Sequence, residues 1–213
     1  MVTIRPIDRE EMPAFFELVK AGPDPFLQRA IELFPSFLDA WSVLEPPEEQ
    51  FKRQERVLGA FVDQRMVGAV MLQRYNGTSE PQLPEKENQQ KFQLIFSHEE
   101  ARVYDRVSRM LADTYINPPA NTLLINSLHV APDKRGQGIG SRLIDDLLRR
   151  IDTEYGEDAY VELASHCPMK SAYRKRGFVK EKETFSIVHH LTMGFWGSTL
   201  LRRSALSSER SVD

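Results

Sequence analysis

Three glycines at alternate positions mark the stretch of the sequence most suggestive of chemistry, RGQGIGS at residues 135–141. It follows an apolar run, TLLINSLHV at 122–130, and precedes an amphipathic segment. A helix that begins here presents unpaired backbone N–H groups, and its dipole favours negative charge at that end. Residues without a Cβ atom let a phosphate approach those N–H groups closely. The spacing predicts an anion site built from backbone amides, with glycines that only turn a tight corner as the alternative.

The details of this spacing exclude two common phosphate-binding motifs. A P-loop requires Lys and then Ser or Thr after its last glycine, whereas Ser141 and Arg142 follow Gly140. A dinucleotide-binding fingerprint reads G-x-G-x-x-G, whereas the glycines here stand at every second position. The sequence therefore points to another class of phosphate-bearing ligand.

Two motifs in the second half of the chain resemble those of the GNAT superfamily of N-acetyltransferases. The run LHVAPDKRGQGIGSRLIDDLL is similar to the family's acetyl-CoA-binding core. The residues that match its L-x-V-x-P and Arg/Gln-x-x-Gly-x-Gly/Ala signatures are Leu128, Val130, Pro132, Arg135, Gly138 and Gly140. The family motif Tyr-x-x-x-Gly-Phe is matched by Tyr173, Gly177 and Phe178. The resemblance covers roughly residues 122–190.

The resemblance implies a reaction and a cosubstrate. Acetyl-CoA would donate its acetyl group directly to an amine in a ternary complex, and coenzyme A would be released. The coenzyme would lie in a V between the strand that ends at Val130 and the strand that ends near Ala164. The residues implied as its binding site are Leu128, His129, Val130, Arg135, Gly136, Gln137, Gly138, Ile139, Gly140 and Ser141, with Lys170 or Arg174 as further contacts to phosphate charge.

Acetyl transfer from a thioester to an amine needs a proton donor for the departing sulfur, because a free thiolate is the poorer leaving group. By the resemblance, Tyr173 is the general acid of this protein. A tyrosine on a short helix that only packs in the core is the alternative.

The same transfer needs an acceptor for a proton of the amine, since an alkyl ammonium is protonated at pH 7. Members of the family carry a base on the strand before L-x-V, but Leu124 and Asn126 stand there in this sequence. We expect Asn126, or Ser127, to orient a water that passes the proton on. His129 and Glu162 are further candidates, each with a structural role as the alternative, and strand alternation predicts that His129 faces away from Asn126.

Apolar periodicity, caps and breakers predict alternating strands and helices. We expect strands at 2–7, 57–62, 67–72, 122–130 and 159–164 and a closing hairpin from 178–188 and 192–202. We expect helices at 9–20, 25–44 with a break near Pro35, 97–115, 139–155 and 168–176. This order predicts an α/β (α+β) fold. The resemblance implies a GNAT-like single domain with a central mixed, mostly antiparallel sheet that is splayed between strands 4 and 5 and flanked by helices.

The chain is predicted to form one acetyl-CoA-binding domain over residues 1–203. Residues 76–118 would be an insertion made of a polar, proline-rich loop and a helix, which serves either as a lid over the acceptor site or as the contact of a homodimer. The small polar residues 204–213 would form a disordered tail.

Composition excludes several classes of partner. A net charge of −3 argues against nucleic-acid binding, and no stretch approaches the length of a membrane span. The only cysteine, Cys167, cannot form an intrachain disulfide and fits a reducing compartment. His189 and His190 have no further ligands at metal spacing, so we expect no metal. These features predict a cytoplasmic protein.

The identity of the acceptor is the least determined feature. The first 50 residues are rich in aromatic and acidic side chains, among them Phe15, Phe16, Phe26, Phe34, Phe37 and Trp41. An aromatic pocket with an acidic rim would bind a cationic small-molecule amine, whereas aromatics that only pack helices on the sheet are the alternative. Three functions stay open: an N-acetyltransferase of small molecules, an acetyltransferase of protein N-termini or lysines, and a non-catalytic acetyl-CoA sensor.

Overall fold

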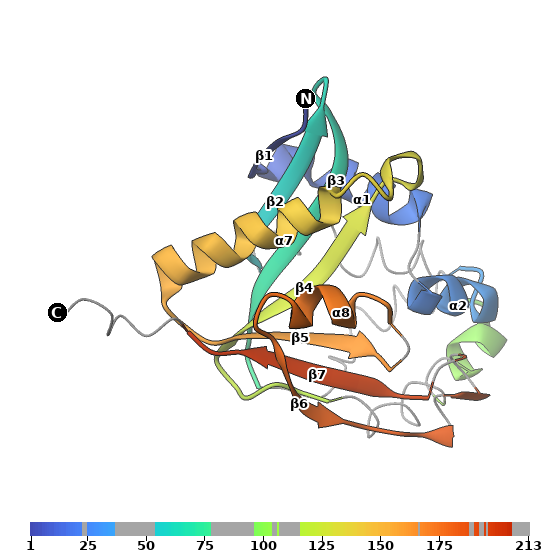
Figure 1. Ribbon diagram of the computed structural model, residues 1–213. Helices are drawn as coiled ribbons and strands as arrows, with labels where there is room; N and C mark the ends of the chain where they lie inside the picture. The colour runs from blue at the N-terminus through green and yellow to red at the C-terminus, as the bar shows by residue number, and fades with distance from the viewer. Residues whose placement is uncertain are drawn as a thin grey trace, which may run out of the picture.

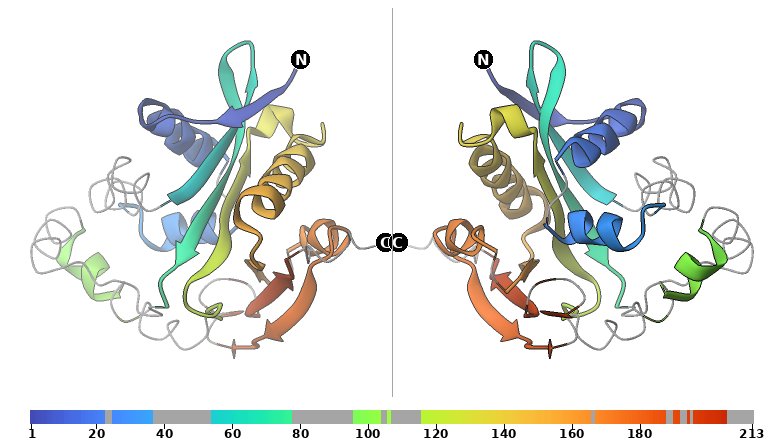
Figure 2. Two further views of the ribbon diagram at one scale, coloured as in Figure 1. Left: turned by 90° about the vertical axis from the view of Figure 1, so that its left-hand side faces the viewer. Right: turned by 90° about the vertical axis from the view of Figure 1, so that its right-hand side faces the viewer.

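The protein folds around a seven-stranded sheet with helices on both faces (Figures 1 and 2). This computed structural model describes residues 1–22, 25–36, 54–77, 96–103, 106, 116–165, 167–187, 190–191, 194 and 196–205. The strand order is β1-β2-β3-β4-β5-β7-β6, and β4 and β5 form the single parallel pair among the described strands. The predicted mixed, mostly antiparallel sheet is confirmed.

The strands agree with the sequence-based expectation in number and order. They are β1 (Thr3–Pro6), β2 (Gln54–Val62), β3 (Arg65–Tyr75), β4 (Thr122–Val130), β5 (Ala159–Ala164), β6 (Val179–Glu183) and β7 (Ser198–Arg203). β4 and β5 begin and end at the predicted residues, and β6 and β7 pair antiparallel but are shorter than predicted. The β2–β3 turn consists of Asp63 and Gln64, both with positive φ (48° and 65°), as a two-residue hairpin with a type I′ turn requires.

The described helices lie where the sequence predicts them, but the helix expected at 168–176 is shorter, from Lys170 to Arg174. They are η1 (Arg9–Glu11), α1 (Met12–Ala21), α2 (Pro25–Leu33), η2 (Pro132–Lys134), α7 (Ile139–Arg150), a π turn η3 (Ile151–Tyr155) and α8 (Lys170–Arg174). The N–H of Asp8 donates to Glu11 Oε2 at 3.0 Å and closes the first turn, which is a 3-10 turn rather than α-helix. Residues 98–103 are helical behind the predicted Ser97–Glu100 capping box. The expectations for 37–44, 78–90 and 107–115 lie outside the described residues.

Two helical layers enclose the sheet, with α1 and α2 on one face and α7 and α8 on the other (Figure 2). We call these the α1 face and the α7 face. Phe15 and Met12 of α1 are buried on one face, and Leu143 and Leu147 of α7 on the other. No helix of the described segments is long and apolar enough to cross a membrane.

The parallel pair of β4 and β5 is short. Pairing covers Leu123 with Ala159, Leu124 with Tyr160 and Ile125 with Val161, and beyond these residues the strands separate (Figure 1). Each strand keeps its outer neighbour, because β4 pairs with β3 as far as Val130 and β5 with β7 as far as Ala164. The predicted splay is confirmed, and it leaves a V-shaped opening in the middle of the sheet.

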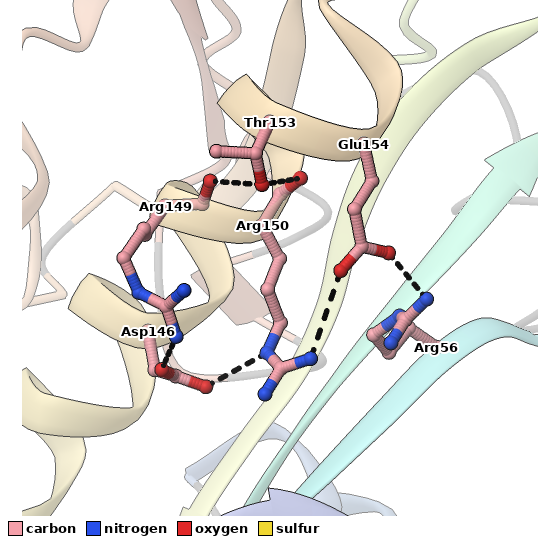
Figure 3. A network of polar contacts seen from close by, with 6 residues as sticks. All are labelled: Arg56, Asp146, Arg149, Arg150, Thr153 and Glu154. Atoms are coloured by element: carbon pink, nitrogen blue, oxygen red, sulfur yellow. Dashed lines mark hydrogen bonds and ion pairs between the residues drawn. The ribbon is translucent and has the colours of Figure 1, made fainter.

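A network of charged side chains fixes the end of α7 (Figure 3). Arg150 Nε donates to Asp146 at 2.9 Å, Arg149 binds the same carboxylate, and Glu154 bridges Arg150 to Arg56 of β2. Burial alone would raise the pKa of Asp146, but the bonds from Arg150 and Arg149 outweigh it and hold the pKa below its ordinary value.

We expect Asp146→Asn to lower the free energy of unfolding by about 1 kcal/mol at pH 7, because the two arginines lose a charged partner. A lowered folded-state pKa contributes stability above the ordinary pKa of 3.8, and this contribution is lost as the pH falls through the folded-state value. The free energies of unfolding of the two proteins, measured in urea at pH 7 and at a pH below 3.8, should therefore differ less at the lower pH. Asp133→Asn, which removes a 3.7 Å surface pair with Lys134, is the control and should have almost no effect. An equal loss at both pH values would contradict the prediction.

Candidate active site

A β-bulge in β4 decides which side chains meet on the α1 face. Leu72 of β3 pairs with Ile125, and the next residue back, Met71, pairs with Ser127, so Asn126 is an extra residue in the ladder. Cross-strand partners share a face of a sheet. Ile125 and Ser127 therefore lie on opposite faces, and the alternation along β4 is shifted by one residue.

The bulge overturns one prediction. Ser127 Oγ lies 3.3 Å from His129 Nε2, so these two side chains share a face. Asn126 Nδ2 donates to Gln73 Oε1 at 3.2 Å, and Gln73 lies on the same face as Met71, the partner of Ser127. The expectation that His129 faces away from Asn126 is wrong, because simple alternation counts no extra residue.

His129 lies between the sheet and α1. It is buried, and its ring packs against Phe15 with centroids 6.0 Å apart at an interplanar angle of 79°. For Phe15, Phe16 and Phe34, all of them buried, the packing alternative holds. Phe37 and Trp41 lie outside the described residues.

Glu162 lies across the opening from Asn126. The pair Leu124–Tyr160 is the last one whose side chains pack on the α1 face, and Asn126 and Glu162 stand two residues further along their strands. The N–H of Ile116 donates to Glu162 Oε1 at 3.2 Å, and the Ser198 side chain gives a second hydrogen bond. Burial raises the pKa of the Glu162 carboxyl above its ordinary value, although both hydrogen bonds lower it in part.

Tyr75 contributes a second polar group on this face. Its Oη is buried and has no hydrogen-bond partner in the described part of the chain. Burial raises the pKa of Tyr75, and the charge of Glu162 raises it further, so the phenol stays protonated near that carboxylate. Sequence reasoning missed Tyr75, Gln73 and Ser198, because only the strand register brings them to this site.

Tyr173 lies on the α7 face. It is buried, and its ring packs against Phe178 with centroids 5.2 Å apart. Burial, and then the charge of Cys167, raise the pKa of the Tyr173 phenol far above its ordinary value, against a smaller lowering by Arg176. The hydroxyl therefore keeps its proton at physiological pH and can act as a donor.

Arg176 holds the short helix of Tyr173 against α7. Its guanidinium binds both carboxylate oxygens of Asp145, at 2.6 and 3.0 Å. It also donates to the carbonyls of Ala172 at 2.9 Å and Ser141 at 3.3 Å. These bonds fix Tyr173 relative to the glycine segment.

The glycine segment has the geometry of an anion site. Gly136 and Gly138 both have φ of +75°, and a Cβ at either would meet nothing within 4 Å. Gly138 is the N-cap of α7, and Ile139 anchors the first turn by its burial. The positive φ, rather than crowding within the protein, requires glycine here, and the open space beside the amides fits a diphosphate.

Three other predicted coenzyme contacts, Arg135, Gln137 and Lys170, have partners within the protein. Arg135 donates to the carbonyls of Val130 and Gly22, and Gln137 to that of Asp133. Lys170 binds Glu183 and the Ser165 carbonyl, whereas Arg174 is exposed. Leu128 and Val130 lie beside α7, since a Cβ on Gly140 would approach both at 3.8 and 3.6 Å. Ser141 is half-buried in the first turn of α7. The fold thus brings the glycine segment, Leu128, Val130 and Tyr173 to the α7 side of the opening, whereas the side chain of His129 lies on the α1 face.

Comparison with known families identifies the protein. The profile described as "Acetyltransferase (GNAT) domain" matches residues 79–193. The chain belongs to the GNAT acetyltransferase family. It is therefore an acyltransferase, and its cosubstrate is acetyl-CoA. No curated protein matches the chain.

Solved structures of low sequence identity share the GNAT fold. An acetyltransferase related to histone acetyltransferase HPA2 from Corynebacterium glutamicum is 16% identical, with a TM-score of 0.62 and 98% of each chain covered. The ribosomal-protein-S18-alanine N-acetyltransferase of Escherichia coli is 12% identical, with a TM-score of 0.59 over 100% of this chain and 99% of its own. The PaiA N-acetyltransferase of Thermoplasma acidophilum, solved with coenzyme A, is 12% identical, with a TM-score of 0.57 over 96% and 99%.

We expect Gly138→Ala to weaken acetyl-CoA binding by roughly 5- to 10-fold, since a left-handed alanine costs about 1–2 kcal/mol and the N-cap shifts to relieve it. Titration calorimetry measures this change. Gly156→Ala is the matched control, because Gly156 has a φ of +63° with equally open space at the other end of α7. It should reduce stability similarly and leave coenzyme affinity unchanged. Equal weakening by both variants would show that lost stability, rather than the amide site, causes the change.

Proposed function

We propose that this GNAT enzyme acetylates the amine of a small molecule, which reaches the thioester from the α1 face. The observation that carries the proposal is the half-buried Glu162 carboxylate, hydrogen-bonded by Ile116 and with a raised pKa, on the opposite side of the sheet from Tyr173. A half-buried carboxylate is more accessible to a slender amine than to a lysine on a folded protein surface. A non-catalytic sensor would have no use for a base and an acid on either side of the opening.

In the proposed mechanism, Glu162 accepts a proton from the bound ammonium. A raised pKa brings the carboxylate closer to the pKa of an amine, which makes it a better base near neutral pH. Asn126, held by Gln73, orients the amine or an intervening water toward Glu162. Asn126 therefore keeps the positioning role predicted from the sequence, and Glu162 supplies the charge that Asn126 lacks.

Acetyl-CoA supplies an activated acyl group as a thioester. The amides of 136–141 and the backbone of 128–130 would hold it along the opening, with the sulfur toward the α7 face. The neutral amine attacks the thioester carbonyl, so that the C–N bond forms and the C–S bond breaks. Tyr173 donates a hydrogen bond and then a proton to the departing sulfur, and the second proton released by the nitrogen restores the phenol, while Glu162 returns its proton to solvent. Much of the acceleration comes from holding both reactants in one site.

A peptide N-terminus is the second candidate acceptor. Among its described residues, the connection between β6 and β7 exposes four large apolar side chains, those of Phe185, Ile187, Leu191 and Trp196, with fractional exposures of 72%, 66%, 71% and 48%. Such a surface suits an apolar peptide that continues beyond the amine. The E. coli enzyme of similar fold, by its name, modifies an alanine of a ribosomal protein.

The organisation of the domain is part of the proposal. One domain spans residues 1–203, since a single sheet contains strands from Thr3 to Arg203. Residues 76–118 are an insertion in this domain, and residues 204–213 form a tail.

Release of free thiol from acetyl-CoA tests the function directly. The panel contains polyamines, arylalkylamines, aminoglycosides and amino-acid amides, together with short peptides that have apolar N-terminal residues. Saturable turnover with one small-amine class supports the proposal. Turnover with peptides alone replaces it by the second candidate. Tight binding of acetyl-CoA without turnover on any acceptor of the panel would overturn both in favour of a sensor.

A further inference from the structure

Arg135 joins two segments that are 113 residues apart in the sequence. Its Nε donates to the carbonyl of Val130, the last residue of β4, at 3.1 Å. Its Nη2 donates to the carbonyl of Gly22, the C-cap of α1, at 3.0 Å. Figure 1 shows the yellow segment after β4 close to the end of α1. One guanidinium thus joins the end of β4 to the end of α1.

Gly22 is shaped for this contact. A Cβ at position 22 would lie 2.5 Å from Arg135 Nη2 and 3.0 Å from Pro132 Cγ. Its φ of −154° lies outside the left-handed region, so a positive φ is not what favours glycine there. A Cβ at this position would instead displace the guanidinium of Arg135. A guanidinium at this place also satisfies a carbonyl at the end of α1 and is favoured by the helix dipole.

We propose that Arg135 is a positioning residue through which coenzyme binding fixes the α1 end of the acceptor site. Arg135 directly precedes Gly136, so an anion held by the amides of the glycine segment also fixes the backbone that carries this guanidinium. The guanidinium then holds the Gly22 carbonyl and with it the last turn of α1. The two bonds to carbonyls, rather than a bond to phosphate, are its function.

The coupling has a thermodynamic consequence. If the coenzyme favours the arrangement in which the acceptor binds, the acceptor must strengthen coenzyme binding by the same factor. Each ligand would then bind more tightly in the presence of the other. The expected change in acceptor KM rests on the proposed function. The expected protection of α1 from hydrogen exchange requires coenzyme A alone.

The test compares Arg135→Lys with Arg142→Lys in the full chain. Both changes keep the positive charge, but a lysine cannot reproduce a two-armed guanidinium contact. Arg142 is a matched control, because it is also exposed and its Nη2 donates to a distant carbonyl, that of Val2, at 3.0 Å. Gly22→Ala breaks the Arg135 contact from the other side without touching the glycine segment.

Amide hydrogen exchange with and without coenzyme A is the primary measurement. In the wild type and Arg142→Lys, coenzyme A should slow exchange in the last turn of α1, residues 17–22. Arg135→Lys and Gly22→Ala should lose this protection while they bind coenzyme A within about threefold of the wild type. Their acceptor KM at saturating acetyl-CoA should rise roughly 5- to 10-fold, and the double variant should be no worse than either single one.

Two results would overturn the inference. One is a wild-type protein in which coenzyme A leaves the exchange of residues 17–22 unchanged. The other is a loss of coenzyme affinity of more than tenfold in Arg135→Lys but not in Gly22→Ala, which would make the guanidinium a phosphate contact. Thermal unfolding shows whether each variant is folded. If either Gly22→Ala or Arg135→Lys fails to fold, the other still tests the same contact. Because the exchange experiment uses no amine, a wrong acceptor class would leave its result intact.

Discussion

Glu162→Gln should lower kcat/KM by about 10²- to 10⁴-fold, the usual contribution of a general base, while the protein stays folded. The amide oxygen of glutamine can still accept the Ile116 N–H, so the change removes the charge and keeps the shape. The acid limb of the pH–rate profile reports protonation of the base, so it should be absent in Glu162→Gln.

The same substitution should stabilise the protein at neutral pH. Because the folded-state pKa of Glu162 is raised, the unfolded chain binds fewer protons than the folded one between the ordinary pKa of 4.5 and the folded value. The stability of the wild type falls as the pH rises through this interval, and Glu162→Gln lacks that decline. A variant that gains stability and loses turnover would be typical of a strained catalytic group.

Glu181→Gln on β6 is the matched control. The Glu181 carboxylate is exposed, and its ion pair with Arg202 is long, at 3.7 Å. It should leave both kcat/KM and the unfolding temperature close to the wild type. Wild-type turnover in Glu162→Gln would remove Glu162 from the mechanism and leave the proton to a water held by Asn126.

Tyr173→Phe should lower kcat by about 10²-fold and leave KM for acetyl-CoA within a factor of two. The phenylalanine keeps the contact with Phe178, so packing and the position of α8 are preserved. What is lost is a hydroxyl that burial keeps protonated and that the proposed mechanism places beside the departing sulfur.

Tyr160→Phe provides the control for Tyr173, because Tyr160 is a buried tyrosine whose pKa is also raised by burial, but on the α1 face. Steady-state kinetics of both variants should separate a proton donor from a core tyrosine. If Tyr173→Phe raises KM and spares kcat, the hydroxyl contributes to binding alone, and the sulfur leaves without an acid.

The backbone conformation of the glycine segment could be predicted from the sequence, because its signals are local. Glycines at 136 and 138 need positive φ, a property of the residue itself, and the motif around Tyr173 occupies six consecutive positions. The bounds of β4 and β5 followed from apolar runs and breakers in the same way.

Glu162 and His129 are candidate bases from the sequence, but which candidates share the α1 face could not be predicted, because that depends on strand register. The bulge at Asn126 is visible only when β4 is aligned with β3, and without it His129 is assigned to the wrong face. Glu162 gains its half-buried, hydrogen-bonded environment from Ile116 and Ser198, which are tens of residues away. Arg135 matches a family signature, but its bond to Gly22 depends on how α1 ends in this chain.

The short parallel pairing of β4 and β5 has a further consequence for handling the protein. Beyond Ile125 and Val161 the sheet contains two strand edges in its interior, and an open edge is where a foreign chain adds itself during aggregation. A coenzyme that lies between them covers both edges and, by mass action, raises the free energy of unfolding in proportion to the logarithm of its concentration. We therefore expect acetyl-CoA to act on this protein as a protectant, and its supply to set the shelf life and solubility of the enzyme.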